Sequence, residues 1–188
     1  MIKAIVFDCF GVLMLEARQS FAQIHQDKFD EIHEITRQAD AGLIDRNDQI
    51  TAYAQITDKP QEEIEEYLMK EHCLNQDLVD VIKSLKTKYK IGMISNIGAD
   101  WYERLVPEDV RLLFDQTILS GEVGMVKPYP EIFELACSKF NMKPSEMVFI
   151  DDILDNCEGA RAVGMQSIHY KNTAQVVSGL NSLSVTVK

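Results

Sequence analysis

Residues 2–13 run Ile2-Lys3-Ala4-Ile5-Val6-Phe7-Asp8-Cys9-Phe10-Gly11-Val12-Leu13. A short apolar run, rich in β-branched residues and ending in a carboxylate and a glycine, is typical of a buried strand that enters a turn. In open α/β sheets, ligands bind at the carboxyl edge of the strands. Asp8 alone is weak evidence for a site, because an aspartate after a strand is more often a helix cap or a solvated turn residue.

Three later segments repeat this arrangement of apolar residues next to polar ones. They lead to Ser95-Asn96, to a glycine- and proline-rich stretch around Lys127, and to Asp151-Asp152 with Asn156 shortly after. Taken singly, Ser95 or Asn96 is normally a helix cap, and an isolated lysine is normally a surface residue. Adjacent carboxylates repel each other unless a cation lies between them. Asp151-Asp152 is therefore the strongest metal signal in the sequence.

In this order along the chain, a nucleophilic aspartate, a strand-end serine, a loop lysine and an acidic pair resemble the four motifs of the haloacid dehalogenase (HAD) superfamily. This superfamily contains phosphohydrolases and dehalogenases. The motifs extend from Ala4 to Gly164 and so cover nearly the whole chain. The resemblance implies an α/β enzyme with a Rossmann-like parallel-sheet core and a small α-helical cap.

The pattern after residue 75 alternates strands with helices, which predicts a parallel sheet with right-handed crossovers. Further strands are expected at residues 112–119 and 166–170, and a terminal helix with a frayed tail after Asn172. Residues 17–74 show apolar residues at helical spacing and no convincing strand. We therefore expect a core of residues 1–15 and 75–188 and a cap of residues 16–74. The resemblance implies that this cap closes over the nucleophile; a bundle that serves stability alone is the alternative.

The resemblance also implies roles for the motif residues. Asp8 would attack phosphorus and form an aspartyl phosphate, which water then hydrolyses. Phosphate oxygens would be held by Ser95, Asn96 and Lys127, and Lys127 would also restrain Asp8. Mg²⁺ would be held by Asp8, the main-chain carbonyl of Phe10 and Asp152, with Asp151 and Asn156 in supporting roles. The implied partner is a small phosphorylated metabolite such as a sugar phosphate, and Arg18 either meets a second anionic group or is solvated.

Phe10 departs from the phosphatase pattern. The phosphatases usually have a second aspartate there, which protonates the leaving oxygen, and losing a general acid costs on the order of 10²–10⁴-fold in rate. One alternative is therefore a catalytically weak phosphate-binding or regulatory protein. Another is a 2-haloacid dehalogenase, because the first motif of those enzymes resembles Asp-x-Tyr-Gly-Thr. Asp151-Asp152 argues against the dehalogenase, since adjacent carboxylates would repel a haloacid.

The composition of the 188-residue chain, 46% hydrophobic and 26% charged, is that of a globular protein with one substantial core. Four scattered cysteines are expected to be reduced thiols. The chain lacks an apolar run of membrane-spanning length, and Lys3 and Asp8 interrupt its apolar N-terminal run, which argues against a signal peptide. We expect a cytoplasmic protein. Its net charge of −11 disfavours nucleic acid and anionic membranes as partners, and the sequence fits a monomer or a dimer.

Overall fold

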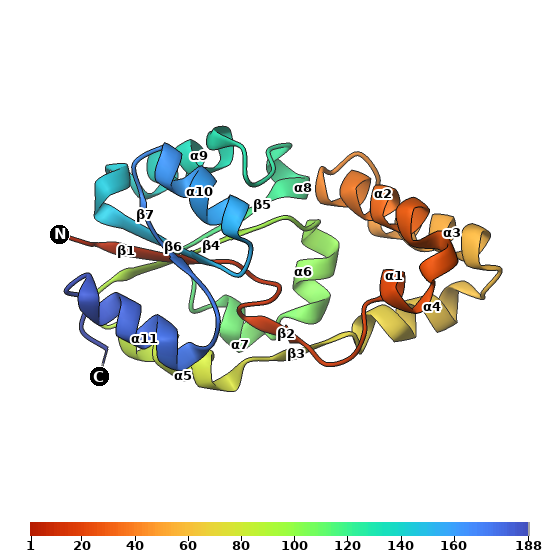
Figure 1. Ribbon diagram of the computed structural model, residues 1–188, viewed down its shortest axis with the longest axis horizontal. Coiled ribbons are helices and arrows are strands. Elements are labelled where there is room, and N and C mark those ends of the chain that lie inside the picture. The colour runs from red at the N-terminus through yellow and green to blue at the C-terminus, as the bar shows by residue number, and fades with distance from the viewer. Residues whose placement is uncertain (188) are drawn as a thin grey trace.

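The computed structural model describes residues 1–187 and contains a five-stranded parallel sheet (Figure 1). Its strands are β1 (Ala4–Phe7), β4 (Lys90–Ser95), β5 (Gln116–Leu119), β6 (Met147–Asp151) and β7 (Gln166–His169). They lie in the order β5-β4-β1-β6-β7, so β1 is central and pairs with β4 and β6. The predicted α/β fold with a parallel sheet is confirmed.

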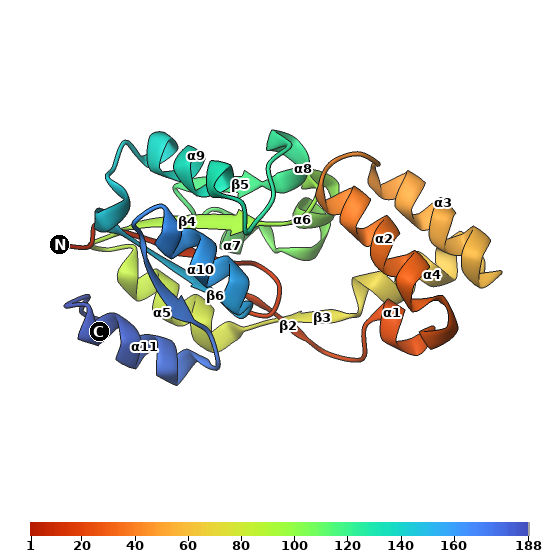
Figure 2. The same cartoon turned by 45° about the horizontal axis from the view of Figure 1, so that its top comes forward.

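The residues of β1 are all buried, and they alternate between two apolar clusters. Ile5 and Phe7 point into one cluster, whereas Ala4 and Val6 point into the other, because successive side chains of a strand face opposite sides of the sheet. The first face is covered by α5 (Gln76–Leu85) and α11 (Thr173–Ser182), and the second by α9 (Pro130–Phe140) and α10 (Leu154–Ala162) (Figures 1 and 2). Burial on both faces explains why the sequence of β1 is almost continuously apolar.

A group of short helices lies apart from the sheet, at one end of the molecule (Figure 2). It comprises α1 (Phe21–Ile24), a 3-10 turn (Gln26–Lys28), α2 (Phe29–Asp40), α3 (Arg46–Thr57) and α4 (Gln61–Met69). An antiparallel ribbon of β2 (Met14–Glu16) and β3 (His72–Leu74) joins these helices, the cap, to the sheet. The expectation of no strand up to residue 74 is therefore wrong at β3. A strand of three residues is too short to show alternation, and its pairing partner lies far away in the sequence.

The remaining helical segments are α6 (Ala99–Leu105), α7 (Glu108–Arg111), α8 (Ser120–Val123) and a 3-10 turn at Pro144–Glu146. The strand expected from residue 112 begins only at Gln116, because α7 and its following turn occupy the chain up to that point. The frayed tail expected after α11 is wrong at Val185, which is 1% exposed and belongs to the core. Of the helices within residues 1–187, none combines the length and apolarity needed to cross a membrane.

Candidate active site

Three strands bring polar side chains to one edge of the sheet. Asp8 follows β1, Ser95 ends β4 and Asp151 ends β6. Because β4 and β6 are the two neighbours of β1, these residues meet although they are far apart in the sequence. All three are buried, with 5%, 1% and 0% exposure respectively. Buried polar groups at the carboxyl edge of a parallel sheet form the usual ligand site of this fold class.

Lys127 lies between the two aspartates. Its Nζ is 2.7 Å from Oδ1 of Asp8 and 2.7 Å from Oδ2 of Asp151. Asn96 holds the lysine backbone, since its Oδ1 accepts from the Lys127 N–H at 2.9 Å and its Nδ2 donates to the Lys127 carbonyl at 3.1 Å. The expected restraint of Asp8 by Lys127 is thus present. The side chain of Asn96 contacts the lysine loop, and its contact with a phosphate oxygen stays a prediction.

Asp151 is a fully hydrogen-bonded carboxylate. Asn156 Nδ2 donates to its Oδ1 at 3.1 Å and its Oδ2 at 3.0 Å, and the Ile153 N–H donates to Oδ1 at 2.8 Å. Together with Lys127, these contacts fix both carboxylate oxygens. Asp151 therefore orients Lys127, and Asn156 holds Asp151 in place. The supporting roles toward Mg²⁺ that the resemblance implies for Asp151 and Asn156 stay predictions.

Asp8, Asp151 and Asp152 form a cluster in which each offers one oxygen, all within 4.8 Å of one another. Lys127 supplies one positive charge to three carboxylates. The excess of negative charge that remains suits a divalent cation, which prefers oxygen ligands. Asp152 lies over Gly11, where an added Cβ would be 2.2 Å from Asp152 Oδ2, and Gly11 has a φ of +76°. A side chain there would displace the Asp152 carboxylate and strain the backbone, so the position favours glycine. The residues therefore fit Mg²⁺, and ligation by the Phe10 carbonyl stays a prediction.

Burial and the neighbouring charges shift the pKa values of Asp8, Asp152 and Lys127. Burial raises the pKa of Asp8 to about 7, and although Lys127 opposes this shift, Asp151 adds to it. Burial and Asp151 also raise the pKa of Asp152. Burial by itself would lower the pKa of Lys127, but the two buried carboxylates hold it above its usual range. A further cation would favour the ionised form of Asp8, the form that can act as a nucleophile.

A cavity of about 1050 Å³ lies between the cap and this edge of the sheet. It is lined on the sheet side by Asp8, Ser95, Asn96, Lys127 and Asp152. Ser95 Oγ is buried and has no hydrogen-bond partner among residues 1–187. Buried polar atoms are nearly always paired in folded proteins, so Ser95 is available to a ligand.

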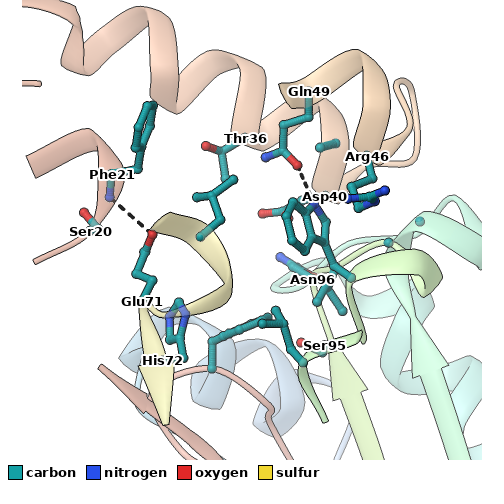
Figure 3. Close-up of a pocket in the computed structure, with 18 of the residues that line it drawn as sticks. Ser20, Phe21, Thr36, Asp40, Arg46, Gln49, Glu71, His72, Ser95 and Asn96 are labelled. Atoms are coloured by element: carbon teal, nitrogen blue, oxygen red, sulfur yellow. Dashed lines mark hydrogen bonds between the residues drawn. The ribbon is translucent and has the colours of Figure 1, made fainter. Parts of the chain in front are cut away.

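Cap residues line the opposite wall, and sequence reasoning did not identify them as site residues. They include Thr36, Asp40, Gln49, Glu71 and His72 (Figure 3). Tyr53 also lines the cavity. Gln49 Oε1 accepts from Trp101 Nε1 of α6 at 2.7 Å, which ties the cap to the core. Arg18 does not line the cavity: its Nε donates to the Lys70 carbonyl at 3.0 Å, and its guanidinium lies 4.1 Å from the centroid of the Tyr67 ring.

Phe10 also lines the cavity, and its ring packs edge-on against His72. The ring centroids are 4.6 Å apart and the interplanar angle is 61°. Burial lowers the pKa of His72, so its imidazole is neutral at pH 7. Where the phosphatases usually have a second aspartate, this protein thus has Phe10, whose ring contacts His72 of β3.

Comparisons with known proteins agree with this arrangement. The chain is 37% identical over 91 residues to a glyceraldehyde 3-phosphate phosphatase of Methanothermobacter thermautotrophicus, a match that covers 45% of this chain and 38% of that protein. The chain spans less than half of the length of the curated relatives that it matches.

Among solved structures, a HAD family enzyme from Bacteroides thetaiotaomicron in complex with magnesium and inorganic phosphate is similar, with a TM-score of 0.76 and 25% identity. The match covers 92% of this chain and 96% of that one. The L-2-haloacid dehalogenase of Xanthobacter autotrophicus shares the fold, with a TM-score of 0.65 and 19% identity over 99% of this chain and 85% of that one. The profile of haloacid dehalogenase-like hydrolases matches residues 2–164. The chain therefore belongs to the haloacid dehalogenase-like hydrolases.

Proposed function

We propose that this protein is a Mg²⁺-dependent phosphomonoester hydrolase that acts through an aspartyl phosphate on a small metabolite phosphate, such as a sugar phosphate. The observation that supports this most directly is the cluster of Asp8, Asp151 and Asp152 around Lys127. A nucleophile beside a cation site and a fixed lysine is what transfer of an anionic phosphoryl group requires, because charge must be offset in the transition state.

In this reaction, an oxygen of Asp8 attacks phosphorus while the bond to the leaving oxygen breaks, and water then hydrolyses the aspartyl phosphate. Lys127 uses two of its three donors on Asp8 and Asp151, which leaves one for a phosphate oxygen. Ser95 Oγ, unpartnered within residues 1–187, supplies a second donor. Mg²⁺ held by Asp8, Asp152 and the Phe10 carbonyl would offset the charge of the phosphate.

The charges of the cavity disfavour a haloacid. Its lining holds one arginine and one lysine, Arg46 and Lys127. Arg46 is paired with Glu65 at 2.6 Å, and Lys127 with its two aspartates. A 2-haloacid would thus bring its carboxylate toward an acidic cluster, in a cavity whose two permanent cations already pair with carboxylates.

Phe10 favours a second candidate, a protein that binds phosphate esters or phosphate without rapid turnover. Phenylalanine has no proton to transfer, and the Phe10 ring is held against His72. The two candidates differ only in rate, because both use the same cation site and the same phosphate-binding donors.

A screen of phosphomonoesters with and without Mg²⁺, run beside a 2-chloropropionate dehalogenation assay, separates these functions. We expect Mg²⁺-dependent release of inorganic phosphate and no chloride release. Chloride release without metal would contradict the proposal. Tight binding of phosphate or fluoroberyllate without turnover would favour the binding protein.

Asp152→Asn is expected to weaken Mg²⁺ binding by at least about 100-fold. Loss of a residue that only supports a metal ligand costs up to about 100-fold, and a direct ligand should cost at least as much. The fold should persist, because Asp152 is exposed and its raised pKa means that a neutral amide costs little. The measurement is isothermal titration calorimetry with Mg²⁺. The control is Asp155→Asn, a change of the same charge at an exposed position of α10. Unchanged Mg²⁺ affinity in Asp152→Asn would end the metal assignment.

A further inference from the structure

The proposed reaction lacks a proton donor for the leaving oxygen. A sugar or other alkyl alkoxide is a poor leaving group, so general acid catalysis matters for such substrates. Phe10 cannot provide it. The cap wall of the cavity, however, carries carboxyl groups at Glu16, Asp40, Asp45 and Glu71, of which Glu16 is exposed to solvent.

Asp40 is the last residue of α2 and is fixed against the core at the site. Its backbone carbonyl accepts a hydrogen bond from Ser120 Oγ, and Ser120 Oγ in turn accepts from the Ile97 N–H at 2.9 Å. Close by, an added Cβ on Gly42 would lie 2.6 Å from the Gly121 carbonyl oxygen, so cap and core backbones touch there. The position of Asp40 is therefore set by the segment that directly follows Ser95.

The carboxyl group of Asp40 is a partly buried acid with no assigned task. No group within residues 1–187 donates a hydrogen bond to it, and it lines the cavity on the cap side, across from Asn96 on the core side (Figure 3). Burial raises its pKa to about 7, and the charge of Lys127 opposes that shift. The charge of Lys127 therefore acts on the Asp40 carboxyl group. With a pKa of about 7, a large fraction of this group is protonated near neutral pH.

The other ionisable groups on the elements packed around Asp40 do not compete for this task. They are His33, Tyr53, Asp45 and Arg46 of the cap, and Asp100, Glu122 and Lys127 of the core. The side chains of His33, Asp100 and Glu122 are exposed to solvent. Burial raises the pKa of Tyr53, which hydrogen-bonds Thr36 and Gln49. Arg46 is paired with Glu65, and Asp45 caps α3 by accepting from the Asp48 N–H at 2.9 Å.

On the cap side of the cavity, Glu71 is the other carboxyl group whose pKa burial raises, and it faces elsewhere. Its Oε2 accepts a hydrogen bond from the Phe21 N–H at 3.3 Å, so it is directed toward α1 (Figure 3). Burial raises its pKa to about 7, and Glu16 and Arg18 are the charges that act on it. Lys127 is not among these charges, whereas it is the charge that acts on Asp40.

We propose that Asp40 donates the proton to the leaving oxygen of the substrate, in place of the carboxyl group that Phe10 lacks. This inference rests on the proposed phosphatase function. As Asp8 forms its bond to phosphorus, the P–O bond of the ester breaks and the Asp40 proton moves to the departing oxygen, which leaves as an alcohol. The Asp40 carboxylate then takes a proton from the water that attacks the aspartyl phosphate, and phosphate leaves with both active-site acids restored.

The test compares Asp40→Asn with the wild type on two substrates in the presence of Mg²⁺. On an alkyl phosphate such as glucose 6-phosphate, kcat should fall by on the order of 10²–10⁴-fold. On p-nitrophenyl phosphate it should change much less, because that leaving group departs without protonation. The wild-type kcat on the alkyl phosphate should decline as pH rises above neutrality and Asp40 ionises, and the variant should lack this decline.

Two further variants make the result specific. Asp48→Asn changes the same charge at an exposed site on α3 of the cap and should leave both activities unchanged. Adding Phe10→Asp to Asp40→Asn should restore turnover of the alkyl phosphate, because a carboxyl group returns to the first motif. A folded Asp40→Asn variant that keeps its alkyl phosphatase activity, or loses both activities equally, would overturn the donor role. A wild type inert toward every phosphomonoester would contradict the proposed function itself, and the donor role with it.

Discussion

Asp8→Asn is expected to abolish phosphate ester hydrolysis, with a loss on the order of 10⁴–10⁶-fold, the scale seen when a covalent nucleophile is removed. The amide is a poor nucleophile. It also removes one carboxylate from the proposed cation site, so part of the loss reflects weaker Mg²⁺ binding. Turnover at saturating Mg²⁺, measured with p-nitrophenyl phosphate, isolates the chemical step from that binding loss.

Asp30→Asn, at an exposed position in the first turn of α2, is the matched control and should retain full activity. Acid-quench trapping of a phosphorylated enzyme provides a second readout. The wild type should yield an acyl phosphate and Asp8→Asn should not. A trapped acyl phosphate in the variant would show that another residue is the nucleophile.

Lys127→Ala should lower the free energy of unfolding at pH 8 by about 3–5 kcal/mol, the usual cost of removing one partner from a buried ion pair. Lys127 is 5% exposed, and without it Asp8 and Asp151 face each other in the interior. The exposed pair of Lys83 and Asp80, 3.6 Å apart, provides a control. Lys83→Ala should cost well under about 1 kcal/mol.

The cost of Lys127→Ala should shrink at low pH. The pKa of Asp8 in the folded protein is about 7, above its ordinary value of 3.8, so the folded state favours the protonated acid. The free energy of unfolding therefore falls as pH rises between those two values. Removal of the lysine raises the Asp8 pKa further, so in the variant this fall continues to higher pH. Urea unfolding at pH 5 and pH 8 measures this difference. Lys127→Met separates charge from volume, and an equal loss at both pH values would show that packing dominates.

The centre of the sheet could be read from the sequence because strands β1, β4 and β6 are short, largely apolar and buried on both faces. The segments at Ala4–Phe7, Lys90–Ser95 and Met147–Asp151 each end in a polar residue or are followed directly by one, and the shared carboxyl edge of a parallel sheet brings those residues together. The ribbon of β2 and β3 was not predictable, because three-residue strands carry no periodic signal and exist only through their pairing.

Some features of the candidate site could also be predicted from the sequence, and others could not. Asp8, Ser95, Lys127 and the pair Asp151-Asp152 were identified from motif order. Asp8, Ser95 and the acidic pair lie at strand ends, and Lys127 lies in the loop between α8 and α9. Asn96 was expected to hold phosphate, yet both ends of its amide contact the Lys127 backbone. That contact depends on how the lysine loop folds back over β4, a distance of 31 residues along the chain.

The sequence by itself determined the fold class, the order of the motifs and the acidic residues of the cluster, because those depend on hydrophobic periodicity and on residue types at strand ends. Only the tertiary structure decided which cap residues face the cluster. Asp40 carries no local signal, since an acid at the end of a helix is ordinary. It lines the cavity because α2 docks against α8, where Ser120 holds its carbonyl and Gly42 meets Gly121. The burial that this docking creates raises its pKa to about 7, and long-range packing of this kind leaves no pattern in the neighbouring residues.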